Sequence, residues 1–400
     1  MTFKRRFNRS NKLIICKCST SSYINRSHLC ERCNAMNSLI VDSGNKYIDD
    51  FIKETQYTKE SGYSEFLEWV PYKKLTNLEH IGRGGFSQIY KATWEKSWGI
   101  SHKGTLERKK TEVVLKVLND SQNVDTEFIK ELKYTYQFKY TIPCYGVTQN
   151  PRTKNYARDG DLNHFFKKNF AEITWNKKIK FLWDIVEGLE KIHCNEILHR
   201  DLHGGNILIK DNDNNAIISD LGFSRPANID SNLSGKSIYG IIPYMAPELF
   251  KGQTYSYASD IYSLGMIMWQ LTSGHRPFHD QEHGPKLILD ILDGKRPEIT
   301  EDTPECWENL MKRCWHPDPS QRPTIDEIHE LSIKFINYKY FNSRKKLNEK
   351  NPDEYDIWLE FEEAEEKRLK MVEFKKPFVK NPGYEHPNSR YYSTLLNPMY

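Results

Sequence analysis

Five segments between residues 82 and 248 contain the residue types that could do chemistry together. The first is Gly82-Arg-Gly-Gly-Phe-Ser-Gln-Ile89, which lies between two strand-like segments. Because glycine lacks a Cβ, backbone N–H groups in such a stretch can approach a phosphate closely, although the same stretch could be an ordinary hairpin turn. The other four segments are centred on charged residues, in chain order Lys116, Asp201, Asp220 and Glu248. The carboxylates of Asp201, Asp220 and Glu248 are of the type that accepts protons or binds a hard cation such as Mg²⁺.

The residues around these charges follow a known order. They read Val113-Val-Leu-Lys116, His199-Arg-Asp-Leu-His-Gly-Gly-Asn206, Asp220-Leu-Gly222 and Ala246-Pro-Glu248. Motifs of this kind, in this order, form the protein-kinase signature set, and His-Arg-Asp-Leu-x-x-x-Asn matches at every fixed position. Residues 75–336 therefore resemble a eukaryotic protein kinase catalytic domain.

Other segments are similar to particular groups of kinases. Cys314-Trp315, Arg322-Pro-Thr324 and Asp260-Ile-Tyr-Ser263 resemble the tyrosine-kinase-like group. The frame that begins at Trp69 resembles a large, expanded family of fungal kinases.

The resemblance implies an α+β fold with two lobes, a small antiparallel sheet lobe with one helix and a large, mostly helical lobe. It implies an enzyme that uses ATP and Mg²⁺ and works by positioning and charge stabilisation. Asp201 would accept the proton of the substrate hydroxyl, and Lys116 would bind the α- and β-phosphates. Asn206 and Asp220 would bind Mg²⁺.

The resemblance also assigns the supporting residues. The nucleotide would be contacted by Gly82, Gly84, Gly85 and Ile89. Glu131 on the following helix would pair with Lys116, and Glu127, one turn earlier, is the alternative. Glu248 would pair with Arg322 to brace the larger lobe, and Asp260 would bind backbone groups behind the catalytic loop.

Hydrophobic periodicity predicts elements that agree with this fold. Strand-like segments are residues 78–81, 88–94, 112–118 and 144–148, with a polar loop at 95–111. Helical patterns run from Asp125 to about Tyr136, from Trp175 to His193, and from Ser259 to Ser273. The last helix is almost wholly apolar, so we expect it to be buried on all sides.

Two departures from the kinase pattern bear on activity. Ser87 replaces the third glycine of the first motif, and its Cβ restricts the backbone. Residues 149–162 are polar where the family has an apolar strand, so about six residues of that strand are missing. One interpretation is a pseudokinase scaffold with weakened ATP binding; another is a trimmed gene model. The presence of every charged catalytic residue favours an active enzyme.

The sequence favours serine or threonine over tyrosine as the acceptor, because Pro243-Tyr-Met-Ala-Pro-Glu248 resembles serine/threonine kinases. His203, which stands where such kinases usually have lysine, argues for the opposite choice. Arg200 resembles an arginine that pairs with a phosphorylated activation loop. The candidate phosphorylation sites are Ser224, Ser231, Ser234, Ser237 and Tyr239. The protein substrate is unknown.

Residues 1–60 form a separate segment with four cysteines. Cys16, Cys18, Cys30 and Cys33 could bind Zn²⁺ as four thiolates, like a zinc ribbon, and His28 is an alternative ligand. The Cys-x-Cys spacing of the first pair is tighter than usual. The other interpretation is a disordered arm that carries cysteines.

Composition limits the remaining possibilities. The net charge of +4 in 400 residues gives little support to a nucleic-acid partner. No apolar run approaches the ~20 residues that a membrane helix needs, and no secretory signal is visible. We therefore expect no membrane partner and a cytoplasmic location, with the nucleus as the alternative.

Residues 337–400 form a charged C-terminal tail. Residues 353–376 are expected to form one helix with a narrow apolar stripe of Ile357, Phe361 and Ala364. This helix could dock on the kinase or on a partner, as could the N-terminal segment, or it could be exposed alone. After Pro377 we expect disorder.

Overall fold

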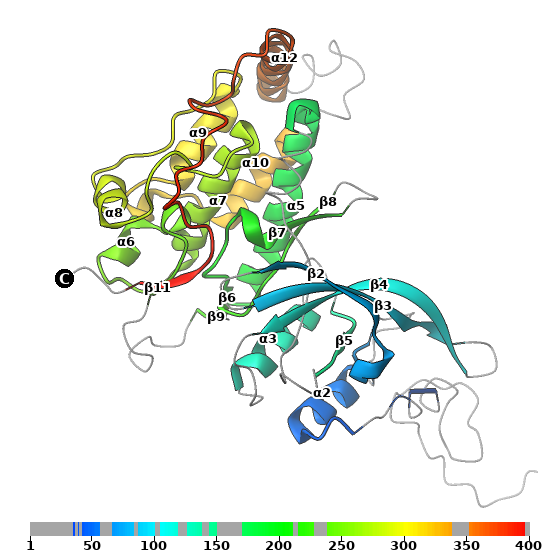
Figure 1. The fold of residues 1–400 in the computed structure, drawn as a ribbon. Coiled ribbons are helices and arrows are strands. Elements are labelled where there is room, and N and C mark those ends of the chain that lie inside the picture. The colour runs from blue at the N-terminus through cyan, green and yellow to red at the C-terminus, as the bar shows by residue number, and fades with distance from the viewer. Residues whose placement is uncertain are drawn as a thin grey trace, which may run out of the picture. The chain divides into compact units, whose positions relative to one another are not determined.

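The computed structural model describes residues 35–36, 39, 42–56, 66–83, 87–100, 105–118, 126–137, 144–149, 170–210, 215–227, 238–337 and 352–396. The chain divides into two compact units, residues 1–129 with 144–159, and residues 130–143 with 160–400. The first unit is rich in strands and the second in helices (Figure 1). The expected α+β fold is therefore confirmed.

The first unit contains a helix and two small sheets. Its elements are α2 (Lys46–Gln56), β1 (Glu68–Trp69), the 3₁₀ turn η1 (Tyr72–Lys74), β2 (Thr76–Arg83), β3 (Ser87–Ile100), β4 (Leu106–Leu118) and β5 (Gly146–Val147). Strands β2, β3 and β4 form an antiparallel sheet in that order, and β1 pairs with β5 in parallel. Helix α3 (Thr126–Gln137) contains the point at which the two units divide.

Strands β3 and β4 are longer than expected. The sequence predicts a polar loop over residues 95–111, whereas β3 continues to Ile100 and β4 begins at Leu106. The polar residues remain in the ladder because backbone pairing satisfies their N–H and C=O groups whatever their side chains. Arg108 strengthens this end by donating to the backbone oxygen of Glu95 at 2.8 Å and to the buried carboxylate of Glu68 at 3.1 Å.

A compact apolar cluster supports the sheet. It consists of Val70, Leu75, Ala92, Trp94 and Leu115. On β3, Ala92 and Trp94 alternate with Lys91, Thr93 and Glu95, which is the pattern of a strand with one covered face.

The second unit is built on long helices. Its helices are α5 (Trp175–Cys194), α6 (Pro247–Phe250), α7 (Tyr257–Ser273), α8 (Pro285–Leu292), α9 (Glu305–Cys314), α10 (Ile325–Asn337) and α12 (Pro352–Glu373). Its 3₁₀ turns are η2 (Phe170–Glu172), η3 (Gly204–Asn206), η5 (Ile242–Tyr244) and η6 (Pro319–Gln321). Its short strands are β6 (Ile197–Leu198), β7 (Ile207–Lys210), β8 (Asn215–Ile218), β9 (Arg225–Pro226), β10 (Ile238–Gly240) and β11 (Thr394–Leu396). Among the described residues no helix has the length and apolar composition needed to cross a membrane.

Helix α7 passes through the centre of this unit. Every residue from Ser259 to Ser273 is buried, as the apolar run predicts. The helix begins with a capping box between Ser256 and Ser259 and ends at Gly274, whose φ of 72° is the left-handed conformation that glycine adopts most readily. Both ends of the helix are therefore fixed by local sequence.

Helix α12 packs on the helical unit, so its apolar stripe has an intramolecular partner. Phe361 and Ala364 are buried, and Phe361 contacts the rings of Trp175 and Phe335. A carboxylate oxygen of Glu365 accepts a 2.9 Å hydrogen bond from the Trp175 N–H at the first turn of α5. An anion at this position satisfies an unpaired donor and complements the helix dipole.

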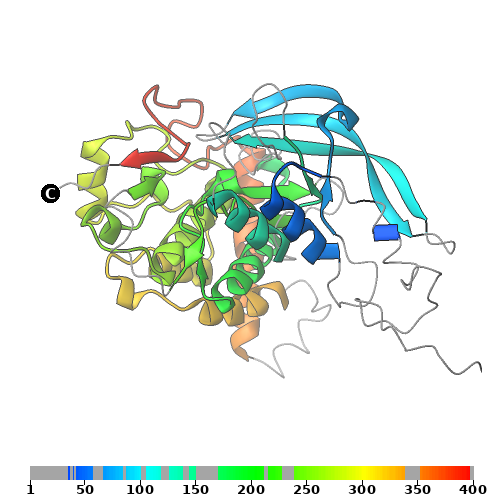
Figure 2. The ribbon, with the colours of Figure 1, turned by 90° about the horizontal axis from the view of Figure 1, so that it is seen from below.

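The chain after α12 is ordered through Leu396, so the expectation of disorder after Pro377 is wrong for the described part of the tail. Residues 374–396 lie along the helical unit and end in β11, which pairs with β10 (Figures 1 and 2, red trace). The tail is polar, but its hydrogen bonds go to the surface of the unit, and composition does not reveal such non-local partners.

A buried ion pair joins α6 to the segment after η6. Arg322 Nη1 and Nη2 each lie 2.7 Å from an oxygen of the Glu248 carboxylate, and both side chains are almost fully buried. Arg322 also donates to the backbone oxygens of Ala258 and His316. This confirms the pairing that the resemblance implies.

Replacing Arg322 with methionine should lower the free energy of unfolding by about 3–5 kcal/mol, because the Glu248 carboxylate would remain buried without its partner. Denaturant unfolding monitored by tryptophan fluorescence measures this. Arg313→Met is the matched control, since Arg313 pairs with Glu327 on the exposed surface at 2.9 Å. It should cost less than about 1 kcal/mol. Equal losses in the two variants would contradict the assigned role of the buried pair.

Candidate active site

One buried carboxylate organises the loop at residues 199–206. Asp260, in the first turn of α7, accepts hydrogen bonds from the backbone N–H groups of His199 at 2.8 Å and Arg200 at 2.9 Å. It also lies 3.0 Å from Nε2 of His193. Burial alone would raise the pKa of Asp260, but the hydrogen bonds and nearby histidines outweigh burial and hold its pKa below the usual range. Asp260 is therefore an ionised anchor for the loop.

The anchor holds a strained backbone. Arg200 has a φ of 69°, in the left-handed region that non-glycine residues rarely adopt. Its N–H bond to Asp260 compensates part of this cost. The strain lies directly before Asp201, so the anchor sets the position of that side chain.

His199 is buried behind the loop in a fixed tautomer. Its Nδ1 accepts from the Asp201 N–H at 3.3 Å, so the proton resides on Nε2, which donates to the Ser219 backbone oxygen at 3.1 Å. Burial lowers the pKa of His199, which agrees with a neutral ring. His199 thereby links the loop to the segment that leads to Asp220.

Asp201 and Asn206 are brought together as expected. The Asn206 Nδ2 donates to the Asp201 backbone oxygen at 2.8 Å. Its side-chain oxygen is the atom that would be left to bind a cation. The Asp201 carboxylate lies within 2.8 Å and 2.6 Å of the Ser393 hydroxyl. His203 is farther away, with its Nε2 3.6 Å from the Asp201 carboxylate.

Asp220 lies beside Asn206 through the β7–β8 pairing. Ile207 on β7 is opposite Ile218 on β8, so Asn206 and Asp220 come just outside the same end of this ladder. Ser219 donates to the Asn206 backbone oxygen from both its N–H, at 2.8 Å, and its hydroxyl, at 3.0 Å. An amide oxygen and a carboxylate are ligands that suit Mg²⁺. The residues present therefore fit a magnesium site.

Gly204 is a supporting residue that the sequence reasoning missed. A Cβ at this position would come within 2.3 Å of the Gln270 side chain. Gln270 is buried in α7 and accepts a 2.6 Å hydrogen bond from the Tyr244 hydroxyl. The polar Gln270 within an apolar helix is the signal that could have found this contact. Gln270 thus joins the catalytic loop at Gly204, helix α7 and the turn η5 at Tyr244. A small pocket that Asp201, His203 and Tyr244 help to line lies beside this contact.

The first unit contains the expected phosphate-binding residues. Ile89 on β3 and Lys116 on β4 are directly opposite each other in the antiparallel register, so their side chains share one face of the sheet. Gly82 lies near the end of β2. Gly84, Gly85 and the side chains of Glu127 and Glu131 lie outside the described residues.

Several other predictions also fall outside the described part. These are the cysteines at 16, 18, 30 and 33, His28, residues 150–162, and the serines at 231, 234 and 237. Among the remaining phosphorylation candidates, Ser224 is buried and donates to the His199 backbone oxygen at 3.3 Å, so it supports the loop. Arg200 stacks over the Tyr255 ring at 4.3 Å.

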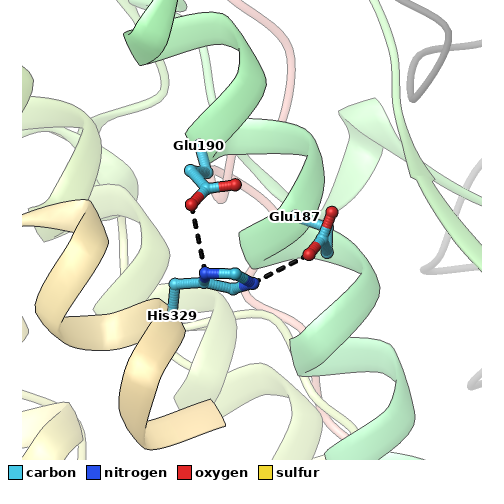
Figure 3. A group of neighbouring side chains, drawn as sticks. All are labelled: Glu187, Glu190 and His329. Atoms are coloured by element: carbon cyan, nitrogen blue, oxygen red, sulfur yellow. Dashed lines mark hydrogen bonds and ion pairs between the residues drawn. The ribbon is translucent and has the colours of Figure 1, made fainter. Parts of the chain in front are cut away.

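A separate cluster joins α5 and α10 through His329. Its Nε2 lies 2.8 Å from Glu187 and its Nδ1 3.0 Å from Glu190 (Figure 3). In the described part of the chain this is the one group of three His, Cys, Asp or Glu side chains close enough to share a metal ion. The imidazole fills the space between the two carboxylates, so the cluster is a link between two helices.

A family model matches residues 75–331 of the chain and is described as protein tyrosine and serine/threonine kinase. The match contains all five motifs singled out in the sequence. The predicted protein kinase domain is therefore confirmed, whereas the similarity to fungal kinases and to a zinc ribbon stays a prediction.

Curated relatives carry consistent names. A putative serine/threonine-protein kinase/receptor of Acanthamoeba polyphaga mimivirus is 28% identical over 284 residues, 70% of this chain and 17% of that protein. A probable serine/threonine-protein kinase of Dictyostelium discoideum is 27% identical over 300 residues, 70% of this chain and 16% of that protein. Mitogen-activated protein kinase kinase kinase 7 of Bos taurus is 27% identical over 283 residues, 68% of this chain and 45% of that protein. This chain thus corresponds to less than half the length of each relative.

Replacing Asp260 with alanine should lower the free energy of unfolding by about 3 kcal/mol or more. The change leaves two backbone N–H groups and one imidazole without their acceptor, and each buried unpaired group costs about 1–3 kcal/mol. Urea unfolding measures the loss. Asp293→Ala, at the exposed end of α8, is the control and should change stability by no more than about 0.5 kcal/mol. A loss of only about 0.5 kcal/mol in Asp260→Ala would show that the Asp260 anchor contributes little to stability.

Stability should fall as the pH drops below about 6.5, the pKa of an ordinary histidine. His199 takes up its proton in the unfolded chain before it does so in the folded chain, because burial lowers its folded pKa. One such group can change the unfolding free energy by up to about 1.4 kcal/mol per pH unit. Chemical unfolding measured from pH 7.5 to 5.5 should therefore show that the unfolding free energy changes less steeply with pH in His199→Gln than in the parent. Identical slopes would exclude this contribution from His199.

Proposed function

Because the chain belongs to the protein tyrosine and serine/threonine kinase family, we propose that it transfers the γ-phosphate of ATP to a serine or threonine hydroxyl of a protein. The observation that carries this proposal is the 2.6 Å contact between the Ser393 hydroxyl and the Asp201 carboxylate. A general base must lie within about 2.6–3.2 Å of the hydroxyl whose proton it accepts. The names of the mimivirus and Dictyostelium relatives, both serine/threonine-protein kinases, agree with it.

Asp201 is the proton acceptor in the proposed reaction. As the acceptor oxygen forms its bond to the γ-phosphorus, the bond between that phosphorus and the bridging oxygen to the β-phosphate breaks, and ADP leaves. Asp201 takes the hydroxyl proton during this exchange. Asn206 holds the backbone of Asp201 in place, and the Asp260 anchor fixes the loop from behind.

Lys116, Asn206 and Asp220 are proposed to position the donor. Lys116 supplies an ammonium group for the α- and β-phosphates from the sheet of the first unit. Asn206 and Asp220 would hold Mg²⁺, which neutralises phosphate charge when it is bound. The glycine-rich segment would cover the phosphates with backbone N–H groups.

The acceptor geometry favours serine or threonine over tyrosine. Ser393 reaches Asp201 from a segment whose next residues pair with β10. A tyrosine hydroxyl lies a full ring farther from its backbone, so a tyrosine in the same strand register would extend past the carboxylate. The alternative of a scaffold with weakened ATP binding rests on the shortened segment at residues 149–162 and on Ser87 in place of the third glycine. The contact between Ser393 and Asp201 favours the enzyme instead.

Other proposals depend on the sequence alone. A cytoplasmic location with the nucleus as alternative, zinc at Cys16, Cys18, Cys30 and Cys33, and partner docking through the N-terminal segment remain predictions. The apolar face of α12 is covered by the helical unit, so partner docking there would have to use its exposed face.

Asp201→Asn should reduce phosphate transfer to an exogenous serine-containing protein such as casein by about 100- to 10,000-fold, because the amide cannot accept the proton. The fold and nucleotide binding should remain, so saturating Mg-ATP should still stabilise the variant by about 2.7 kcal/mol at 100 times its dissociation constant. Radiolabel transfer and thermal unfolding measure the two effects.

Lys116→Met should lose both the transfer and the thermal shift, whereas Asp293→Asn should keep both. Undiminished transfer by Asp201→Asn would remove Asp201 from its proposed role. A parent chain with no shift at millimolar Mg-ATP would contradict nucleotide binding altogether.

A further inference from the structure

The C-terminal tail connects α12 to the catalytic loop within the helical unit. Residues 374–396 run from the end of α12 along the loop at residues 274–283 and reach β10 (Figures 1 and 2). The start of this path is fixed, because Glu365 caps α5 and Arg368 donates to the Ala171 backbone oxygen at 2.8 Å. Helix α12 therefore holds the start of the tail on the same unit as the catalytic loop that its end reaches.

Backbone hydrogen bonds hold the middle of the tail. The His386 N–H donates to the His279 backbone oxygen at 2.8 Å, and the His283 N–H donates to the Asn388 backbone oxygen at 3.2 Å. The Arg390 N–H donates to His283 Nδ1 at 3.0 Å. These contacts set the register of the tail, since each joins a specific backbone atom.

Tyr391 anchors the tail two residues before Ser393, the residue that contacts the catalytic loop. Its hydroxyl donates to the Pro277 backbone oxygen at 2.9 Å, and the Arg276 guanidinium stacks over its ring at 3.8 Å. The ring also meets His283 edge-on at 4.6 Å. Two residues later, Ser393 is 8% exposed and faces Asp201.

Three residues beyond Tyr391 the tail becomes a strand. Thr394, Leu395 and Leu396 pair antiparallel with Gly240, Tyr239 and Ile238. Strand addition to a free edge is a common way to bind a peptide, because main-chain hydrogen bonds align the peptide whatever its sequence. Tyr255 fixes the position of β10, because its hydroxyl donates to the Tyr239 backbone oxygen at 2.6 Å.

The tail thus has both features of a bound substrate peptide, a paired strand and a hydroxyl on the proposed base. The Ser393 hydroxyl contacts both Asp201 oxygens, at 2.8 Å and 2.6 Å. With the tail in place the Asp201 side chain is almost fully buried, so a second peptide could not bring its hydroxyl to the same atoms.

We propose that Ser393 is an intramolecular phosphorylation site and that the tail blocks other protein substrates until Ser393 is phosphorylated. The proposal rests on the proposed kinase activity. The Ser393 Oγ forms a bond to the γ-phosphorus of ATP, the bond from that phosphorus to the β-phosphate oxygen breaks, Asp201 takes the Ser393 proton, and ADP leaves.

Phosphorylation would release the tail because of charge. Phosphoserine carries about −1.5 to −2 charge near pH 7, and it would be formed beside the Asp201 carboxylate. Like charges in a nearly buried site repel strongly. The anchored α12 and the tethered tail would remain attached to the unit, while the acceptor site becomes open to other proteins.

The first test follows the phosphate in the full chain. The purified protein is incubated with Mg-ATP, and phosphorylated residues are mapped by mass spectrometry. Ser393 should be labelled in the parent, not in Ser393→Ala, and still labelled in Ser389→Ala, which changes a serine four residues earlier in the same tail. Ten-fold dilution of the protein should leave the fraction of Ser393 labelled per unit time unchanged, because an intramolecular reaction is first order in the protein.

Two outcomes separate this inference from the proposed function. If casein is phosphorylated while Ser393 is not, the kinase proposal stands and the tail inference is wrong. Labelling of Ser393 in an Asp201→Asn chain mixed with the parent would show transfer between molecules and overturn the intramolecular site. If neither casein nor Ser393 is labelled, both proposals fail.

The second test measures the block. Ser393→Glu places a negative charge beside Asp201. In initial-rate assays, before the parent becomes phosphorylated on Ser393, it should raise kcat/KM for casein about 10-fold, the gain expected if about one molecule in ten is open in the unphosphorylated parent. Ser389→Glu, the matched control, adds the same charge away from Asp201 and should change kcat/KM by less than about 2-fold. An equal response of the two variants, or no gain with Ser393→Glu, would contradict the block.

Discussion

The ionised carboxylate of Asp260 is the contact on which the active site depends. It accepts the N–H groups of His199 and Arg200 and contacts the His193 ring, so one side chain joins the start of α7, the end of α5 and the catalytic loop. α7 can serve as the foundation because it is buried on all sides. The strained backbone at Arg200 persists because these contacts compensate for it.

The rest of the catalytic loop depends on the same constraint through short steps. His199 is held in one tautomer between the Asp201 N–H and the Ser219 oxygen. Ser219 in turn bonds to Asn206, and this brings Asp220 close to the two catalytic-loop residues. The loop therefore needs little reorganisation for phosphate transfer, and its preorganised polar groups are the source of catalysis in this class of reaction.

The C-terminal residues have both a structural and a proposed regulatory role. Glu365 on α12 caps α5, the helix that supplies His193, while residues 391–396 contact Asp201 and β10. A segment that supports the fold at one end and fills the acceptor site at the other can be released without loss of its anchor. This arrangement explains how a polar tail is ordered although it adds little to the apolar core.

Motifs and periodicity predicted the parts of the molecule that depend on local sequence. Helices α5 and α7, the Asp201–Asn206 pair and the Glu248–Arg322 bridge follow from apolar spacing or from motif residues. The length of the β3–β4 hairpin was not predictable from its polar residues, since backbone pairing extends the ladder whatever the side chains, and the supporting contact of Arg108 with Glu68 joins residues 40 positions apart.

The tail could not be predicted for a similar reason. Ser393 and Asp201 are 192 residues apart, and no local pattern around Ser393 indicates its partner. Gly204 is likewise explained only by Gln270, which packs against it from α7.

Amide hydrogen exchange at His199 and Arg200 tests the central constraint most directly, because it reports on the two N–H groups that Asp260 accepts. The account predicts slow exchange at both amides in the parent chain. In Asp260→Ala both should exchange much faster, while the amides of β7 and β8 remain protected. Equally slow exchange at His199 and Arg200 in the two proteins would contradict the claim that Asp260 holds the catalytic loop.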